Sequence, residues 1–248
     1  MRITRVHHPQ QLTAGAEVTL SASVSRHLIK VLRLRGGDQV TLFNAKEGEY
    51  RAEVLESGHP LVVALVRKKL RSYQPPLLAL SLSLALSRGD RMDYAIQKAT
   101  ELGVIAITPL YSEFTEVKFR DTTRLGKKLR HWQQIAEHAA EQSGRLDVPS
   151  INPPQDFKDA IAAVDTDQAL VFEASGESAP KDILASGSVT LFTGPEGGFS
   201  PEEIKFAKTS GYPVVRLGPR ILRAETAPLV ALAVLQQLYG DFSLPINS

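Results

Sequence analysis

The feature that most constrains the fold is an alternation of short apolar runs with helical patterns across residues 77–240. The apolar runs, each of strand length, are 77–86, 104–110, 168–175, 189–194 and 212–218. The main helical patterns are 91–103, 125–144 and 225–240. Strands that alternate with helices of this length indicate a parallel sheet with helices on both faces. We therefore expect an α/β fold for this part of the chain.

Residues 1–73 have a different pattern, in which β-rich runs follow one another. These runs are 38–44, 49–56 and 60–69. The stretch 25–34 is predicted to be one short helix with Ser25 as its N-cap. The segment 71–76 holds two prolines and no apolar period, which favours a domain boundary. We expect two domains, 1–73 and 74–248.

Charge is distributed unevenly, although the net charge is only +2. Residues 1–74 contain 12 Lys and Arg against 6 Asp and Glu, whereas the remainder contains 17 against 21. A basic module joined to a mildly acidic body would explain the difference, and so would chance clustering of solvated charge. Arg26, Lys30 and Arg33 are spaced to share one face of the expected helix, which makes them candidates for phosphate contact.

Composition excludes several classes of protein and site. The chain has no cysteine, so it has no disulfide, zinc–thiolate site or cysteine-ligated iron–sulfur cluster. The first ten residues lack the apolar core of a signal peptide. The run 77–86 has about half the length needed to span a bilayer. We expect a cytoplasmic protein with no membrane partner and no metal.

A glycine-bearing stretch, residues 193–199, follows a buried run and precedes a helix; it is called the first loop below. Ser200 and Glu203 have the spacing of a capping box, so the helix should begin after the glycines. The first loop lacks the lysine of a phosphate-binding loop and the dinucleotide fingerprint. Glu196 inside it would repel phosphate, which favours an uncharged or cationic ligand. The alternative is a tight turn that requires positive φ at one of its glycines.

A second polar stretch, residues 216–226, joins the last buried run to the final helix; it is called the second loop below. It contains three arginines and one carboxylate, Glu225. Parallel sheets bind ligands at the carboxyl ends of their strands, so we expect the two loops to lie at neighbouring strand ends. The alternative is that Arg223 and Glu225 form a local ion pair or a helix cap.

Several motifs together resemble the RsmE family of ribosomal RNA methyltransferases, in the SPOUT (trefoil-knotted) superfamily. They are LFTGPEGGFSPEEI, LGPRILRAETAPLVAL, RHLIKVLRLRGGD, QKATELGV and AEHAAEQSGR, and they occur in family order. The resemblance implies a PUA-like RNA-binding β-barrel in residues 1–73. It also implies a knotted, dimerising domain that binds S-adenosylmethionine (SAM) in residues 74–248. The reaction implied is N3-methylation of one uridine in the 16S rRNA of the small ribosomal subunit.

The resemblance also implies where SAM and RNA bind. Bare backbone at Gly194 and Gly197 would approach the adenosine, and the second loop would form the opposing wall. The residues expected to bind SAM are Phe192, Thr193, Gly194, Glu196, Gly197, Leu217, Gly218, Ile221 and Leu222. The residues expected to contact RNA are Arg26, His27, Lys30, Arg33, Arg35, Gln142 and Arg145.

Arg223 and Glu225 match the family's R-x-E-T pattern and are expected to act in catalysis. Uridine N3 must lose its proton before or during methyl transfer, so a general base or a nearby cation would help. Arg223 is expected to bind substrate charge or phosphate. Glu225 is expected to orient the uridine or to accept its proton.

Two other functions stay open from the residues alone. A non-catalytic RNA-binding or ribosome-assembly protein would explain the basic module but not the two elaborated loops. A Rossmann-type nucleotide-binding enzyme would explain the sheet, but its phosphate loop would not contain Glu196. The final helix is apolar on nearly every side, so we also expect a homodimer.

Overall fold

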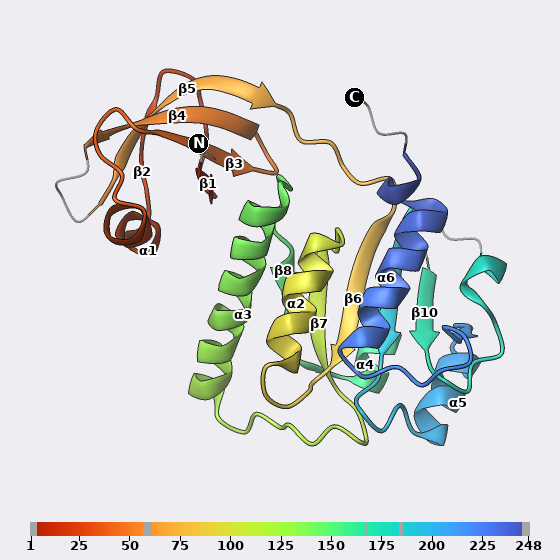
Figure 1. The fold of residues 1–248 in the computed structure, drawn as a ribbon. Coiled ribbons are helices and arrows are strands. Elements are labelled where there is room, and N and C mark those ends of the chain that lie inside the picture. The colour runs from red at the N-terminus through yellow and green to blue at the C-terminus, as the bar shows by residue number, and fades with distance from the viewer. Residues whose placement is uncertain (1–3, 57–60, 167, 184–185, 245–248) are drawn as a thin grey trace. The chain divides into compact units, whose positions relative to one another are not determined.

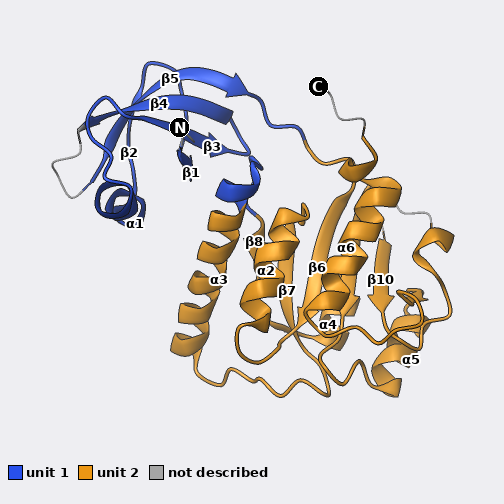
Figure 2. Cartoon of the chain, viewed as in Figure 1, with its two compact units in different colours: residues 1–74, 140–148 blue, residues 75–139, 149–248 orange. Residues whose placement is uncertain are grey.

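The computed structural model describes residues 4–56, 61–166, 168–183 and 186–244 (Figure 1). The first residue of the expected strand 60–69 falls outside these ranges. The chain divides into two compact units (Figure 2). Unit 1 comprises Met1–Gln74 and Ala140–Val148, and unit 2 comprises Pro75–Ala139 and Pro149–Ser248.

Unit 1 contains a five-stranded sheet in the order β1-β3-β4-β5-β2. The strands are β1 (Thr4–His7), β2 (Glu17–Thr19), β3 (Gln39–Asn44), β4 (Gly48–Glu56) and β5 (Val63–Arg71). β1 is parallel to β3, and the other pairs are antiparallel. The three expected strands are confirmed as β3, β4 and β5. β1 and β2 were not predicted, because each is too short to show a period.

The predicted helix 25–34 is wrong at both ends. α1 (Ala22–Arg26) is capped by Ser21, and a π-helical turn, His27–Val31, follows it. The hydroxyl of Ser25 is buried, where it donates to the Leu20 carbonyl at 3.2 Å and accepts from the Val62 N–H at 2.9 Å. Ser25 therefore fastens the helix to the sheet instead of capping it.

The expected basic stripe is also broken. Arg33 has a φ of 58°, a left-handed conformation that an α-helix does not allow. The π-helical turn before it also changes the angular spacing of side chains. Arg26 and Lys30 are exposed, but Arg33 does not share a helix face with them.

A buried charge network connects the N-terminal sheet to the stretch Ala140–Val148 within unit 1. Arg5 donates to Glu49 at 2.7 Å, and its guanidinium also donates to three carbonyl oxygens at 2.8 to 3.1 Å. These carbonyls belong to Ala140, Glu141 and Arg145. Arg71 pairs with the other oxygen of Glu49 at 2.6 Å.

Glu49 is the buried centre of this network. Burial alone would raise the pKa of its carboxyl, but hydrogen bonds from Arg71 and Arg5, together with their charges, outweigh burial and lower it. A folded-state pKa below the unfolded value stabilises the protein above the ordinary carboxyl range. That contribution is lost as the pH falls through the folded-state pKa.

Unit 2 contains a parallel sheet in the order β12-β10-β11-β6-β7-β8, with β9 paired to β7. Its strands are β6 (Ala79–Ala85), β7 (Ala106–Tyr111), β8 (Ser150–Ile151), β9 (Gln155–Asp156), β10 (Gln168–Phe172), β11 (Ser188–Thr193) and β12 (Val214–Val215). The expected parallel sheet is confirmed, with all of its strand pairs parallel.

Helices cover both faces of this sheet. They are α2 (Arg91–Glu101), α3 (Thr122–Ser143), α4 (Phe157–Ala162), α5 (Pro201–Thr209) and α6 (Thr226–Tyr239). α4 and α5 share one apolar core with β10 and β11, whereas α6 contacts α2 and the sheet strands (Figure 1). Among the described residues, no helix is long and apolar enough to cross a membrane.

Candidate functional site

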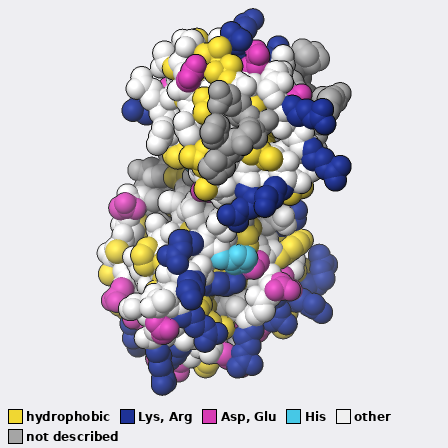
Figure 3. Space-filling view, turned by 90° about the vertical axis from the view of Figure 1, so that its left-hand side faces the viewer, with side chains coloured by type: hydrophobic (Ala, Val, Ile, Leu, Met, Phe, Trp, Pro, Cys, Tyr) yellow, Lys and Arg dark blue, Asp and Glu magenta, His cyan; other side chains and the backbone are white. Residues whose placement is uncertain are grey.

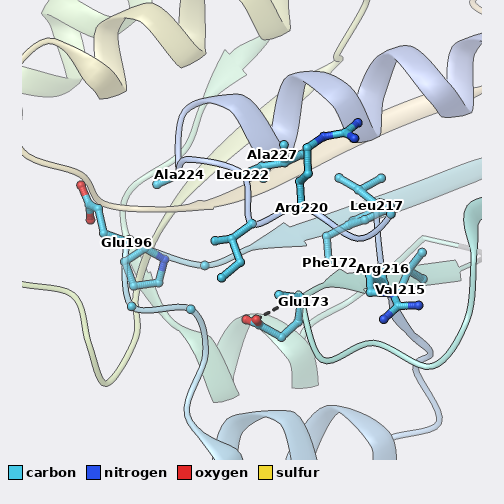
Figure 4. Close-up of a pocket in the computed structure, with 17 residues that line it drawn as sticks. Phe172, Glu173, Glu196, Val215, Arg216, Leu217, Arg220, Leu222, Ala224 and Ala227 are labelled. Carbon is cyan, nitrogen blue, oxygen red and sulfur yellow. Dashed lines mark hydrogen bonds between the residues drawn. The ribbon is translucent and has the colours of Figure 1, made fainter.

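A pocket lies at the carboxyl ends of β10, β11 and β12 in unit 2. Its walls are Phe172–Ala174 at the end of β10, residues 194–198 of the first loop, much of the second loop, and Ala227 at the start of α6. In Figure 4, Glu196 lies on the left of the pocket, Glu173 below it and Arg216 on the right. Three strand ends and one helix start therefore position the site.

The sequence predicts that the two loops follow neighbouring strands, and this prediction is wrong. β10 lies between β11 and β12, with Phe172 paired to Thr193 on one side and to Val215 on the other. The residue after β10, Glu173, therefore enters the pocket between the loops. Sequence reasoning missed it. The signal available was a carboxylate directly after a buried apolar run.

Glu173 holds the first loop in shape. Its Oε2 accepts from the Phe199 N–H at 3.0 Å, and its Oε1 accepts from the Ala174 N–H at 2.7 Å. Gly198, with a φ of +72°, passes close by, and a Cβ there would lie 2.7 Å from Glu173 Oε2. Gly198 alone of the loop's three glycines has the positive φ that the tight-turn alternative requires.

The other two glycines of the first loop are constrained by contacts within the protein. A Cβ on Gly194 would lie 3.0 to 3.2 Å from the backbone of Gly198 and Phe199. A Cβ on Gly197 would lie 3.2 Å from the Cβ of Phe114. A side chain at either position would therefore force its neighbours in the protein to shift, whether or not a ligand is bound.

The capping box expected at the start of α5 is confirmed. The Ser200 N–H donates to Glu203 Oε2 at 2.8 Å, and the Glu203 N–H donates to the Ser200 hydroxyl at 3.3 Å. Both residues are buried, and Pro201 is the first residue of the helix. The first loop is thus held at its helical end by backbone hydrogen bonds.

Glu196, which the sequence analysis expects to repel phosphate, forms an ion pair within the protein. Arg91 at the start of α2 forms an ion pair with it, so much of its charge is compensated. Glu173 forms no ion pair among the described residues, and it is the acidic group that would oppose a phosphate in this pocket. The expected repulsion of phosphate therefore depends on Glu173, and it is opposed by Arg216 and Arg220 in the same pocket.

The second loop contributes one exposed apolar side chain, Ile221, and two half-buried ones, Leu217 and Leu222, to the opposite wall. Leu217, Gly218, Ile221 and Leu222 all line the pocket, and Ile221 is 88% exposed. An isoleucine with so little protein around it is available to pack against a ligand. Arg216 and Arg220 of the same loop line the pocket as well.

Two of the expected SAM-binding residues do not line the pocket. Phe192 is fully buried and packs edge-on against Phe157, with ring centroids 5.9 Å apart, so it supports the loop from below. Thr193 is also fully buried, and its hydroxyl has no hydrogen-bond partner among the described residues. The other seven line the pocket: Gly194, Glu196, Gly197, Leu217, Gly218, Ile221 and Leu222.

Arg223 and Glu225 flank Ala224, which lines the pocket, but they are not lining residues themselves. No ion pair joins them among the described residues, and Glu225 occupies the N-cap position of α6 without a side-chain capping bond. The local alternatives for this pair are therefore wrong. Glu225 Oε2 is buried and has no hydrogen-bond partner in the described structure. A buried carboxylate oxygen without a donor is costly, which fits a group that receives its partner from a substrate.

Comparison with known proteins settles the family. Residues 74–236 match the RNA methyltransferase domain family, and residues 20–66 match the RNA methyltransferase PUA domain family. The chain belongs to the RNA methyltransferase family of RsmE proteins. It is 33% identical to ribosomal RNA small subunit methyltransferase E of Buchnera aphidicola subsp. Schizaphis graminum, over 98% of this chain and 99% of that one.

Two solved structures of methyltransferases are similar over their full length. One is a protein of Legionella pneumophila in complex with the bound cofactor SAM, 34% identical, with a TM-score of 0.92 over 97% of this chain and 100% of that one. The other is ribosomal RNA small subunit methyltransferase E of Neisseria gonorrhoeae bound to S-adenosyl methionine. It is 36% identical, with a TM-score of 0.89 over the same shares.

The residues expected to contact RNA lie in unit 1. Arg26, His27, Lys30, Arg33 and Arg35 are all exposed around α1 and the turn that follows it. Gln142 and Arg145 belong to the stretch Ala140–Val148, where the Arg145 side chain is mostly buried and pairs with Asp147 at 2.6 Å. In the described part of the chain, no cluster of acidic or histidine side chains has the arrangement of a metal site.

Proposed function

We propose that this protein is a SAM-dependent methyltransferase that methylates N3 of a uridine in the 16S rRNA of the small ribosomal subunit. The observation that carries the proposal is the pocket at the ends of β10, β11 and β12, in a chain whose relatives include two SAM-bound structures. The relatives named as small subunit methyltransferases cover nearly the whole chain, which supports ribosomal RNA as the substrate.

The residues of the pocket fit SAM in both charge and shape. Glu173 offers a carboxylate to the ribose hydroxyls or to the sulfonium cation of SAM. SAM contains no phosphate that this carboxylate would repel. Leu217, Ile221 and Leu222 provide apolar surface for the adenine ring. The bare backbone of the first loop lets amide and carbonyl groups approach the nucleoside closely.

When bound, SAM supplies an electrophilic methyl group, and the protein's part is to present uridine N3 without its proton. Glu225 has a buried oxygen without a donor, which supports a role in accepting a hydrogen bond or the proton from N3. Arg223 is exposed beside it and would stabilise the negative charge that develops on the uridine or bind an adjacent phosphate.

The proposal includes the domain roles of the RsmE family. Residues 1–73 would form the PUA-like RNA-binding barrel, and residues 74–248 the knotted catalytic domain. The knot is proposed from membership in the RsmE family alone. A protein that modifies ribosomal RNA in this way would act in the cytoplasm.

A homodimer is part of the same proposal. α6 buries Ala231, Leu232 and Leu235 against its own unit. Its apolar residues Leu229, Val230, Ala233 and Val234 are only half-buried, and Leu238 is 42% exposed. A second copy of the chain would cover this remaining face. Light scattering at micromolar concentration tests this, and a monomer would contradict it.

The decisive experiment uses methyl-labelled SAM and small ribosomal subunits that lack the modification. Label should appear on N3 of one uridine in 16S rRNA, as located by mass spectrometry of nuclease fragments. Calorimetry separates the rivals, because SAM binding without ATP binding supports the methyltransferase. ATP binding alone would support a nucleotide enzyme, and binding of neither would support a non-catalytic RNA-binding protein.

A further inference from the structure

The segment after β7 is held directly against the first loop. Glu203 of the capping box bridges the two, since its Oε2 accepts from the Ser200 N–H and its Oε1 accepts from the Glu113 N–H at 2.9 Å. The next residue, Phe114, packs beside Gly197. The carboxyl end of β7 therefore presents its side chains at the rim of the candidate SAM pocket.

Phe114 is exposed although it is large and apolar. Its exposed fraction is 46%, and it lines a second hollow that shares Glu196 and Gly197 with the SAM pocket. The arginines Arg88 and Arg91 line the same hollow, where they pair with Glu116 and Glu196. Asp90 and Glu113 line it too, so the positive charge that would hold a strand must come from outside the hollow. The exposed aromatic face of Phe114 offers a platform on which a nucleic acid base can stack.

A row of uncompensated cations begins at Lys118, a few residues after Phe114. These residues are all exposed, and none forms an ion pair or side-chain hydrogen bond among the described residues: Lys118, Arg120, Arg124, Lys127 and Arg130. Their neighbour Lys128 differs, because it pairs with Asp93 at 2.9 Å. Figure 3 shows the molecule from the side on which Figure 1 draws α3. Lys and Arg side chains gather in the lower part of that view. Unit 2 is acidic as a whole, so this concentration of positive charge is local.

The beginning of the basic segment has a fixed shape. Ser112 and Thr115 form a hydroxyl-bonded turn with their oxygens 2.9 Å apart. Phe119 then packs edge-on against Trp132 of α3, with ring centroids 6.2 Å apart. The aromatic side chain and the cations are therefore presented by anchored backbone, which lowers the entropy lost when a strand binds.

We propose that residues 114–130 form a binding surface for single-stranded RNA on the catalytic unit, which is separate from the RNA-binding role assigned to residues 1–73. Phe114 stacks a base next to the methyl-transfer site, and Lys118, Arg120, Arg124, Lys127 and Arg130 contact the phosphates of the strand that leads to it. The surface rests on the proposed function, because it assigns the substrate strand a path to that site.

A second protein copy is a poorer partner for this surface. A two-fold dimer contact here would place the same unpaired cations opposite one another, which disfavours association. The phosphate backbone instead gains affinity from each cation through the release of condensed counterions. We therefore expect RNA affinity to depend steeply on salt concentration, and we expect these residues to cause part of that dependence.

The first test replaces two of the cations, Arg124→Gln with Lys127→Gln. The matched control replaces two exposed cations elsewhere in unit 2, Lys181→Gln with Lys205→Gln. Binding of a labelled fragment of 16S rRNA is measured across a series of salt concentrations, together with SAM affinity. If each cation contacts one phosphate, the slope of log affinity against log salt flattens by about 1.4 in the first variant, which is about 0.7 per residue. The control keeps the wild-type slope, and both variants bind SAM normally.

The second test addresses Phe114. Phe114→Leu keeps an apolar side chain without an aromatic face, and Phe114→Tyr keeps the face. Stacking of one base contributes about 1–3 kcal/mol, so we expect the Leu variant to weaken RNA binding about tenfold and the Tyr variant to retain it. In methylation assays the Leu variant should raise KM for RNA more than it lowers kcat.

Several outcomes would overturn this proposal. An unchanged salt slope in the Arg124/Lys127 variant, or equal flattening in the control, would show that these cations are only solvated. Equal RNA affinity of the Leu and Tyr variants would remove the stacking role. Because RNA binding is read without turnover, these results stand whether or not the labelling experiment detects uridine methylation, and the two proposals fail separately.

Discussion

The two loops that form the candidate SAM pocket are built in different ways. The first loop is held by its own protein contacts, with Phe199 buried in the apolar core and its N–H bonded to Glu173. The second loop has few such contacts, and its most prominent side chain, Ile221, is 88% exposed. We infer that the first loop has its binding shape before the ligand arrives, whereas the second gains contacts from the ligand.

We therefore expect substitutions in the two loops to affect different properties, namely the stability of the fold and the affinity for SAM. Substitutions in the first loop should be felt mainly as lost stability or a displaced backbone. Substitutions in the second loop should leave folding unchanged and appear in binding or turnover.

The largest expected effect is on stability. Phe199→Ala removes a buried aromatic side chain that packs against Phe157 at a centroid distance of 4.6 Å. Such a truncation costs about 3–5 kcal/mol of unfolding free energy. Urea denaturation followed by circular dichroism measures it. A loss no larger than that of Ile221→Ala would remove the contrast between the loops.

The next effect is on turnover. Glu225→Gln keeps the size of the side chain but removes its capacity to accept a proton, so we expect turnover to fall about 100-fold or more. SAM affinity should stay within about twofold, because Glu225 does not line the pocket. Glu202→Gln, the same change at an exposed position of α5, is the control. Equal losses of turnover and SAM affinity would mean that Glu225 shapes the cofactor pocket instead.

A smaller effect concerns Gly197 of the first loop. A side chain at this position would either collide with Phe114 or obstruct the bound SAM. Gly197→Val brings a Cβ within 3.2 Å of Phe114, so the loop must shift, and overpacking of this kind costs about 1–3 kcal/mol. We expect SAM affinity, measured by calorimetry, to fall about tenfold while the fold is kept.

The double variant Gly197→Val with Phe114→Gly removes the Phe114 Cβ and ring, which are the neighbours that force the shift. If it recovers SAM affinity, the protein contact is the reason for glycine. If affinity stays low, the added side chain obstructs the adenosine directly. Normal SAM binding by the single variant would contradict the loop assignment altogether.

The smallest effect concerns Ile221. Ile221→Ala should change the unfolding free energy by no more than about 0.5 kcal/mol, because the side chain makes little contact with the protein. SAM affinity should fall about fivefold, since the apolar surface that covers the adenine is reduced. A stability loss of several kcal/mol would show that the second loop is as well packed as the first.

Sequence reasoning succeeded where the cause is local. The alternating periods of unit 2 and the Ser200–Glu203 capping box depend on neighbours in sequence, and both are confirmed. Glu173 was missed because its position depends on β10 lying between β11 and β12, which is a matter of long-range strand order. The ion pair of Glu196 was missed for the same reason, since its partner Arg91 is more than 100 positions away in the chain.

The prediction of a helix that begins after Ser25 was wrong for a different reason. Serine before an apolar run has the usual features of an N-cap, but Ser25 is bonded to Leu20 and Val62 across a tertiary contact. Tertiary contacts override capping preference, and no local pattern reveals them. The left-handed conformation of Arg33 is equally hidden, because arginine has no preference for it.

The stretch Ala140–Val148 has a consequence for the order in which the protein folds during synthesis. Phe43 is buried against Ala140 and Leu146, and Arg5 has three carbonyl partners in the same stretch. A nascent chain that ends at residue 74 would leave Phe43 uncovered and those hydrogen bonds unmade. At typical synthesis rates of about 5–20 residues per second, the N-terminal sheet must wait several seconds for its last structural segment. The N-terminal unit therefore begins first on the ribosome but is completed only when more than half of the chain has emerged.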